Sequence, residues 1–375
     1  MRSPLFRASA RASRKAIALG LFFLLPLYSQ IGQQVSLSPG AYLPVEEALL
    51  QLAELQDSQF DGPELRWDPL FRLGVLTVNN HRIAFTAAAR GSEGLAILDS
   101  KTILVVSSPF LDNGQLFFPE PFIAALKKTL NSAEDPYQFR VAAIIVDPGH
   151  GGKDNGAVGT HKIGGETLQV KEKDVALSVS LDLYSRLKKA FPDKQILLTR
   201  DRDYFPSLED RVVIANSVDL KDNEAIVFIS IHANASFRRT ARGYEVWYLS
   251  PDYRRNVIDI EKYADAMEVI PILNAMLEEE FTTESIMIAQ AITRKLEEIL
   301  GNAIPSRGIK AEEWFVVRNA RMPSVLVELG FVTNQEDARL LTNVAYLNKF
   351  SEALYKGIED FIKSFENSRG FTAIQ

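Results

Sequence analysis

Apolar and polar positions divide the chain into two parts with different patterns. Between residues 40 and 135, short β-like apolar runs such as "LGVLTVNNHRIAFTA" and "GLAILDSKTILVVSSP" are separated by turn residues, and "VEEALLQLAEL" has a helical pattern. This pattern predicts a small β-rich accessory domain over 40–135 with one or two helices. The polar stretch "NSAEDPYQF" is expected to be the linker that follows it.

From residue 140 onward, apolar runs alternate with amphipathic helices. The runs "VAAIIV", "QILLT", "AIVFISI", "YEVWYL" and "SVLVEL" predict strands, and a helix is expected to begin near Asp174. Such alternation predicts an α/β domain over 140–365, with a mixed, mainly parallel sheet flanked by helices. One face of the first helix carries the residues expected to pack on the sheet: Val175, Val179, Leu183 and Leu187.

Composition agrees with two globular parts. The chain has 375 residues, of which 46% are hydrophobic and 24% charged, so it can bury a sizeable core. Its net charge of -6 offers no basic surface, so we expect no nucleic-acid partner. Cysteine is absent, which excludes disulfides, lipid attachment through an N-terminal cysteine, and thiol chemistry.

The first 30 residues resemble an export signal. Arginines and a lysine precede the apolar stretch "AIALGLFFLLPLY", which is shorter than the roughly 20 residues that a spanning helix needs. We therefore expect residues 1–30 to be a signal peptide and the protein to be exported, to the periplasm or cell envelope. A retained anchor is the alternative, because "LYSQIGQQ" lacks a small-x-small cleavage pattern.

Candidate chemistry comes from the four histidines, His81, His150, His161 and His232. His150 and His232 each follow a buried-strand pattern, in "AAIIVDPGH" and "IVFISIHAN". In open α/β sheets, loops from neighbouring strands converge at the carboxyl edge, so these two side chains are expected to meet. His81 has no ligand-like neighbours, and we expect it to be structural.

Two glutamates complete a hydrolytic site. Glu172, at the start of the helix near Asp174, would join the histidines as a third zinc ligand and leave the fourth position for water. Glu328 lies inside the apolar run "SVLVEL", where burying a carboxylate is costly unless it has a partner or a function. Next to a metal it would act as general base and then general acid.

Each of these residues also has a purely structural interpretation. His150 could be a turn residue and His232 a hydrogen-bonded core histidine, while Glu172 could be a charged helix N-terminus. Glu328 could be the buried partner of Arg200 or Arg211. The phosphate-cradle alternative is excluded, because "GHGGKDNG" has neither dinucleotide-binding nor P-loop spacing.

Six motifs occur in the order and nearly the wording of the type-3 family of zinc-dependent N-acetylmuramoyl-L-alanine amidases. They are "VDPGHGGKDNGAVG", "KEKDVALSV", "LLTRDRDYFPSLEDRVVIAN", "FISIHANAS", "GYEVWYL" and "VLVELGFVTNQEDARLL", and the resemblance covers roughly residues 141–362. It implies cleavage of the amide between N-acetylmuramic acid and L-alanine in peptidoglycan. It also implies one Zn²⁺ per chain on His150, Glu172 and His232, with Glu328 as the catalytic residue.

The resemblance leaves alternatives open. His161 and Glu166 are rival ligands in a stretch longer than usual for the family; we expect Glu172 to be the ligand and His161 to lie in a solvated loop. A zinc peptidase that cuts the stem peptides would use the same metal chemistry, and a non-catalytic wall-binding regulator would need a broken site. The protein is expected to be a monomer.

An extra segment at 253–281 is rich in acids. Glu261, Asp265 and Glu268 fall on one face of a helix, which is typical of a solvated surface. The resemblance offers another interpretation: family members that act in cell division carry an inserted helix that blocks the zinc cleft until an activator protein withdraws it. The accessory domain itself is weakly similar to the N-terminal domain of copper amine oxidases, which suggests a wall-targeting or partner-binding role, or a spacer.

Overall fold

The computed structural model describes residues 42–55, 62–79, 81–99, 102–132, 140–220, 224–258 and 270–367. The expected signal peptide at 1–30 lies outside these ranges. Within them, every helix is too short or too polar to cross a bilayer.

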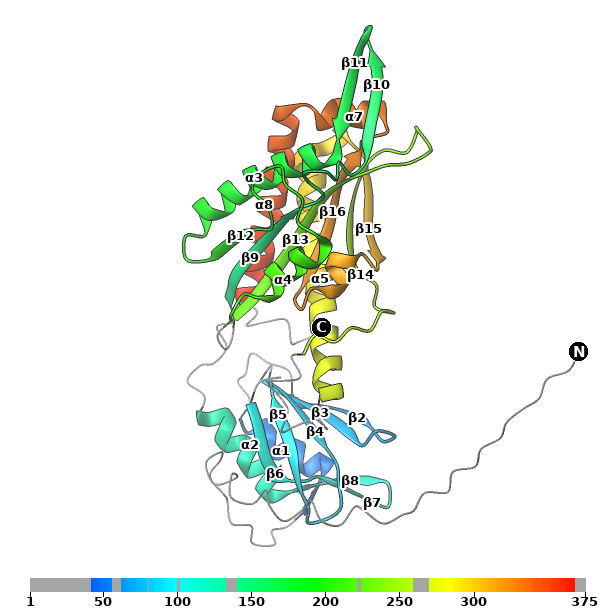
Figure 1. Ribbon diagram of the computed structural model, residues 1–375. Helices are drawn as coiled ribbons and strands as arrows, with labels where there is room; N and C mark the ends of the chain where they lie inside the picture. The colour runs from blue at the N-terminus through cyan, green and yellow to red at the C-terminus, as the bar shows by residue number, and fades with distance from the viewer. Residues whose placement is uncertain are drawn as a thin grey trace, which may run out of the picture.

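The N-terminal part is built from two antiparallel sheets and two helices (Figure 1). The five-stranded sheet runs in sequence order through β2 (Glu64–Asp68), β3 (Leu73–Val78), β4 (His81–Thr86), β5 (Glu93–Leu98) and β6 (Thr102–Ser107). The three-stranded sheet has the order β1 (Tyr42–Pro44), β8 (Gln115–Pro119), β7 (Phe110–Asp112). The helices are α1 (Val45–Ala53) and α2 (Glu120–Ser132). The predicted β-rich region is therefore confirmed, while its boundaries at 40 and 135 stay a prediction.

A single core joins these sheets and helices. Phe85 of β4 packs against Phe118 of β8 and Phe122 of α2, with ring centroids 5.3 and 5.5 Å apart. All three side chains are fully buried. His81 of β4 is also buried, and its Nδ1 lies 2.9 Å from Asp99 Oδ2, which agrees with the structural role predicted for it.

The second part contains a six-stranded mixed sheet. Its order is β12 (Gln195–Leu198), β9 (Arg140–Pro148), β13 (Glu224–Asn234), β16 (Ser324–Phe331), β14 (Tyr244–Leu249) and β15 (Ser306–Glu312). Every neighbouring pair is parallel except β16 and β14. The predicted α/β fold with a mainly parallel sheet is therefore confirmed.

Helices cover both faces of this sheet (Figure 1). One face packs against α3 (Glu172–Ala190), α5 (Ile270–Leu300) and α8 (Val344–Asn367). The other packs against the short helices α4 (Leu208–Asn216) and α6 (Phe315–Asn319), and α7 (Gln335–Leu341) follows β16. The stripe predicted on α3 is buried, since Val175, Val179, Leu183 and Leu187 all belong to the main core.

A hairpin that was not predicted from the sequence lies between β9 and α3. It consists of β10 (Val158–Ile163) and β11 (Glu166–Lys171), paired antiparallel. The expectation that His161 lies in a solvated loop is wrong: its side chain is buried and its Nε2 lies 2.8 Å from the Val332 carbonyl oxygen. The alternation of the hairpin turns His161 inward, and a buried ring needs such a partner.

The N-terminal half of α5 contacts the accessory region. Met276 is buried there with Val257 and Ile258, against Ala84 and Ile97 of the five-stranded sheet. Glu279 adds ion pairs to Arg66 and Arg82 at 3.4 and 3.7 Å. Figure 1 shows this end of α5 reaching the five-stranded sheet, so the described flanks of the segment 253–281 join the two parts of the molecule.

Candidate metal centre

Three side chains from separate elements meet at the carboxyl edge of the main sheet. His150 follows β9, Glu172 is the first residue of α3, and His232 lies near the end of β13. One ligand atom from each lies within 4.8 Å of the others. Glu172 Oε1 is 3.0 Å from His150 Nε2 and 2.8 Å from His232 Nδ1. The structure thus brings together the three residues that were predicted as ligands, and it leaves Glu166 exposed on β11.

The loop after β9 depends on glycine and on an unusual backbone. His150 has a φ of 58°, in the left-handed region, which turns its imidazole toward Glu172. A Cβ at Gly149 would collide with the His232 ring, and one at Gly156, itself at φ 62°, would come 2.6 Å from the His150 ring. The glycines therefore give the two imidazoles room to approach one another.

A buried ion pair between Asp147 and Arg211 anchors the loop that follows β9. Asp147 is fully buried and accepts hydrogen bonds from Thr199, Ser230 and Arg211 at 2.5, 2.7 and 2.6 Å. Burial raises the pKa of Asp147, but the Arg211 charge and these hydrogen bonds outweigh it and hold the pKa below its usual value. Arg211 also donates to the His150 carbonyl oxygen at 2.6 Å, so the pair anchors the His150 backbone.

Replacing Arg211 by methionine is expected to lower the free energy of unfolding by about 3–5 kcal/mol, because it leaves Asp147 buried without its cation. The measurement is urea unfolding at neutral pH. Arg202→Met is the matched control, since its ion pair with Asp201 is exposed and should change stability by less than about 1 kcal/mol. A loss below about 1 kcal/mol for Arg211→Met would contradict the anchoring role.

Asp154 positions His150, and sequence reasoning missed it. Its Oδ2 lies 2.7 Å from His150 Nδ1, which leaves Nε2 as the atom that faces Glu172. A carboxylate on the far nitrogen of a ligating histidine fixes the tautomer and the ring orientation. The signal was available in "GHGGKD", where an acid follows the histidine by four residues.

The electrostatics of Glu172 suit a ligand. Burial raises its pKa, but hydrogen bonds from His150 and His232 outweigh this and hold the pKa far below the usual value. The carboxylate is therefore ionised at neutral pH. Its second oxygen accepts from the Ala157 backbone N–H at 2.7 Å, and this bond orients Oε1 toward the imidazoles.

Glu328 lies beside this cluster on the neighbouring strand β16. It pairs in register with His232 across β16 and β13, and it is only 7% exposed. Burial, then the charges of Glu172 and Glu245, raise the pKa of Glu328 well above its usual value. Among the described residues, no donor reaches its Oε2. The structural alternative is wrong, since Arg211 pairs with Asp147, and Arg200 donates to backbone carbonyls such as that of Pro148.

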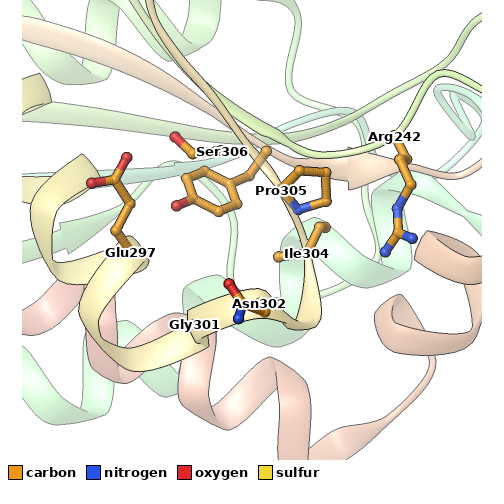
Figure 2. Close-up of a pocket in the computed structure, with 8 residues that line it drawn as sticks. Arg242, Glu297, Gly301, Asn302, Ile304, Pro305 and Ser306 are labelled. Atoms are coloured by element: carbon orange, nitrogen blue, oxygen red, sulfur yellow. The ribbon is translucent and has the colours of Figure 1, made fainter.

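A polar depression lies at the same edge of the main sheet, but on the opposite face from the His-Glu-His cluster. Figure 2 shows Arg242, Glu297 and Asn302 around it, with Ile304, Pro305 and Ser306. Tyr244 lines it, whereas Glu245, the next residue on β14, faces the opposite side with Glu328. The depression is therefore separate from the His-Glu-His cluster.

An α/β sheet with a possible metal site and an adjacent buried carboxyl is compatible with a metal-dependent hydrolase, and comparison with known proteins identifies the family. Residues 144–360 match the Amidase_3 family, described as N-acetylmuramoyl-L-alanine amidase. The chain belongs to this family. It is thus a peptidoglycan amidase, a hydrolase of the bond between N-acetylmuramic acid and L-alanine.

The chain is also similar to individual proteins of known name. The chain is 29% identical over 262 residues to N-acetylmuramoyl-L-alanine amidase AmiA of Escherichia coli, covering 65% of this chain and 85% of that protein. It is 27% identical over 285 residues to the amidase LytC of Bacillus subtilis, covering 74% of this chain but 47% of that longer protein. The solved amidase AmiC2 of Nostoc punctiforme is 31% identical, with 59% of this chain and 97% of that chain covered and a TM-score of 0.42.

Proposed function

We propose that the enzyme hydrolyses its amide with one zinc ion held by His150, Glu172 and His232, and with Glu328 as the proton-transferring residue. The observation that carries the proposal is the approach of one ligand atom from each of the first three side chains to within 4.8 Å of the others, beside the buried Glu328, whose Oε2 has no hydrogen-bond partner among the described residues. It assigns a function to a carboxyl group that would otherwise only cost stability.

The donor set fits zinc. Ligand atoms about 2 Å from one ion, at tetrahedral angles, lie about 3.3 Å from each other. The separations of 3.0 and 2.8 Å between Glu172 Oε1 and the two imidazole nitrogens are close to this value, and the two nitrogens lie within 4.8 Å of each other. Two imidazoles and one carboxylate are also the ligands of known hydrolytic zinc sites.

In the proposed mechanism, zinc when bound polarises the scissile carbonyl and lowers the pKa of a water molecule toward about 7. Glu328 accepts the proton of the water that attacks the lactyl carbonyl carbon. It then delivers this proton to the nitrogen of L-alanine as the carbon–nitrogen bond breaks. The products are the lactyl carboxylate on the glycan and a peptide with a free amine. Asp154 and the Asp147–Arg211 pair keep His150 in place throughout.

Metal content and product analysis together test this proposal. Purified enzyme is expected to contain about one zinc per chain, and a chelator should abolish dye release from labelled sacculi until zinc is restored. Mass spectrometry should find glycan with a free lactyl group together with intact stem peptides. Shortened peptides would instead support the zinc-peptidase alternative, and absence of turnover in the zinc-loaded protein would support a non-catalytic wall-binding regulator.

The proposal places the protein outside the cytoplasm, in the periplasm or cell envelope, because peptidoglycan lies there. The relatives are cell-wall amidases, and the signal expected at 1–30 would deliver the chain to this compartment. Cell-wall remodelling or daughter-cell separation is the corresponding process.

We also propose that an activator protein acts on the acidic segment 253–281. Its candidate residues Glu261, Asp265 and Glu268 lie outside the described residues, so the segment keeps its two interpretations. The flanks are structural, since Glu278 accepts from the Arg255 backbone N–H at 2.6 Å and Met276 contacts the accessory region. A test should therefore leave these flanks intact.

Replacing residues 259–269 by a short Gly/Ser linker is expected to raise basal dye release from purified sacculi if this segment blocks the site. The comparison is with the full chain at equal zinc content. Unchanged or lower activity in a folded variant, judged by its thermal transition, would favour the solvated-surface interpretation.

A further inference from the structure

A buried carboxylate lies next to Glu328 on the neighbouring strand. Glu245 of β14 is directly opposite Glu328 of β16 in an antiparallel pair, where opposed side chains share one face of the sheet. Glu245 is only 1% exposed. Asn234, two residues after His232, approaches it at 3.5 Å. The carboxylate therefore belongs to the wall of the proposed reaction site and has no assigned role in the mechanism.

Two cations from β15 converge on this one carboxylate. Lys310 Nζ lies 2.8 Å from Glu245 Oε1, and Arg307 Nε donates to the same oxygen. Aromatic rings flank both groups: the Arg307 guanidinium lies 5.1 Å from the centroid of Phe331, and Lys310 Nζ lies 4.9 Å from that of Trp247. Cation–π contacts and a shared buried anion hold these long side chains in fixed positions.

Arg307 and Lys310 together carry more positive charge than Glu245 neutralises. They bring two positive charges to one Glu245 carboxylate, and among the described residues neither forms an ion pair with Glu328. Their side chains are 37% and 31% exposed, so solvent and ligands reach them. Arg307 uses Nε for Glu245, and within the described part of the chain no acceptor bonds to its terminal nitrogens, which leaves them for a planar anion such as a carboxylate.

We infer that Arg307 and Lys310 form a carboxylate-binding subsite for the stem peptide, and that Glu245 is the positioning residue that holds them. The inference rests on the proposed function, which places the scissile amide beside Glu328. The peptide released by this cleavage carries carboxylates beyond L-alanine, whereas the glycan on the other side of the bond is uncharged near it. The subsite therefore receives the leaving group and sets a preference for acidic peptides.

The test compares two soluble muropeptides of equal length, one with free peptide carboxylates and one with carboxamides in their place. The zinc-loaded wild type is expected to prefer the acidic substrate in kcat/KM. Lys310→Gln should lower kcat/KM for the acidic substrate about 10-fold, through loss of a charge-assisted contact, and change the amidated one less than about 2-fold. This variant keeps Arg307 on Glu245, so Glu245 is not left unpaired.

Matched variants separate the subsite from a structural effect. Lys310→Arg should retain the preference, and Lys349→Gln, which removes an exposed cation on α8, should change neither substrate. Equal losses on both substrates, or a wild type that does not discriminate, would overturn the subsite. Failure of the zinc-loaded wild type to cleave either muropeptide or intact sacculi would instead overturn the proposed function.

Discussion

Replacing Glu328 by glutamine is expected to lower kcat by about 10²–10⁴-fold while zinc stays bound. Glutamine keeps the shape of the side chain but can neither accept the proton of the attacking water nor deliver one to the leaving nitrogen. Glu328 is not one of the three clustered ligand candidates, so metal affinity should be retained. The fold should also tolerate the change, since a neutral amide replaces a carboxyl group that burial already disfavours in its charged form.

The measurement is kcat on a soluble muropeptide, with zinc quantified in the same preparation. Glu313→Gln is the matched control: it makes the same chemical change at an exposed position and should leave kcat unchanged. A Glu328→Gln enzyme that turns over within about 3-fold of wild type would remove Glu328 from the mechanism, because general acid–base catalysis is worth far more than that.

Replacing His232 by alanine is expected to abolish both zinc binding and amide hydrolysis. The substitution removes one of three ligand candidates and leaves Glu172 Oε1 with one imidazole neighbour, His150. Two remaining protein ligands fall short of the three that catalytic zinc sites provide. The expected readouts are a metal content near zero after dialysis and no dye release from labelled sacculi.

His161→Gln is the matched control for this substitution. His161 is a buried histidine of the same part of the chain, and its Nε2 bonds to a backbone carbonyl oxygen rather than to the cluster. An amide can make that hydrogen bond, so zinc content and activity should remain near wild type. If His232→Ala kept stoichiometric zinc, or the control lost it, the assignment of the cluster would be wrong.

The buried Asp147–Arg211 ion pair is expected to make the stability of the fold sensitive to acid. Because the pKa of Asp147 is lower in the folded than in the unfolded chain, its contribution to stability is present above about pH 4. It is lost as the pH falls through the folded-state value. The Arg211→Met variant lacks this pair and should lose less stability on acidification than wild type does.

Local pattern was sufficient to predict much of the fold and of the candidate site. The strands that became β9, β13 and β16 were visible as apolar runs, and the histidines at the ends of β9 and β13 were expected to meet. The core-facing residues of α3 followed from helical spacing. Glu172 and Glu328 were candidates from their positions at a helix start and inside an apolar run, and the resemblance then implied their roles. These features are encoded within a few residues of one another, which is the range over which periodicity is informative.

Contacts between distant segments were not predictable in this way. His161 was expected in solvent, yet the hairpin folds it against Val332, 171 residues further along the chain. Asp154 and Arg211 were not recognised as the supports of His150, since each depends on how a loop packs. The convergence of Arg307 and Lys310 on Glu245 required the placement of β15 beside β14.

The amino-acid order alone therefore established the class of fold, the reactive residue types and their place at the ends of strands, because hydrophobic period and strand-end position are local properties. Distances, partners and charge states came from the folded arrangement. Whether Glu328 is neutral or paired, and which nitrogen of His150 faces Glu172, depends on burial and on neighbours from other elements. Desolvation and Coulomb interactions act through space, so the same residues acquire these properties only when the chain has brought them together.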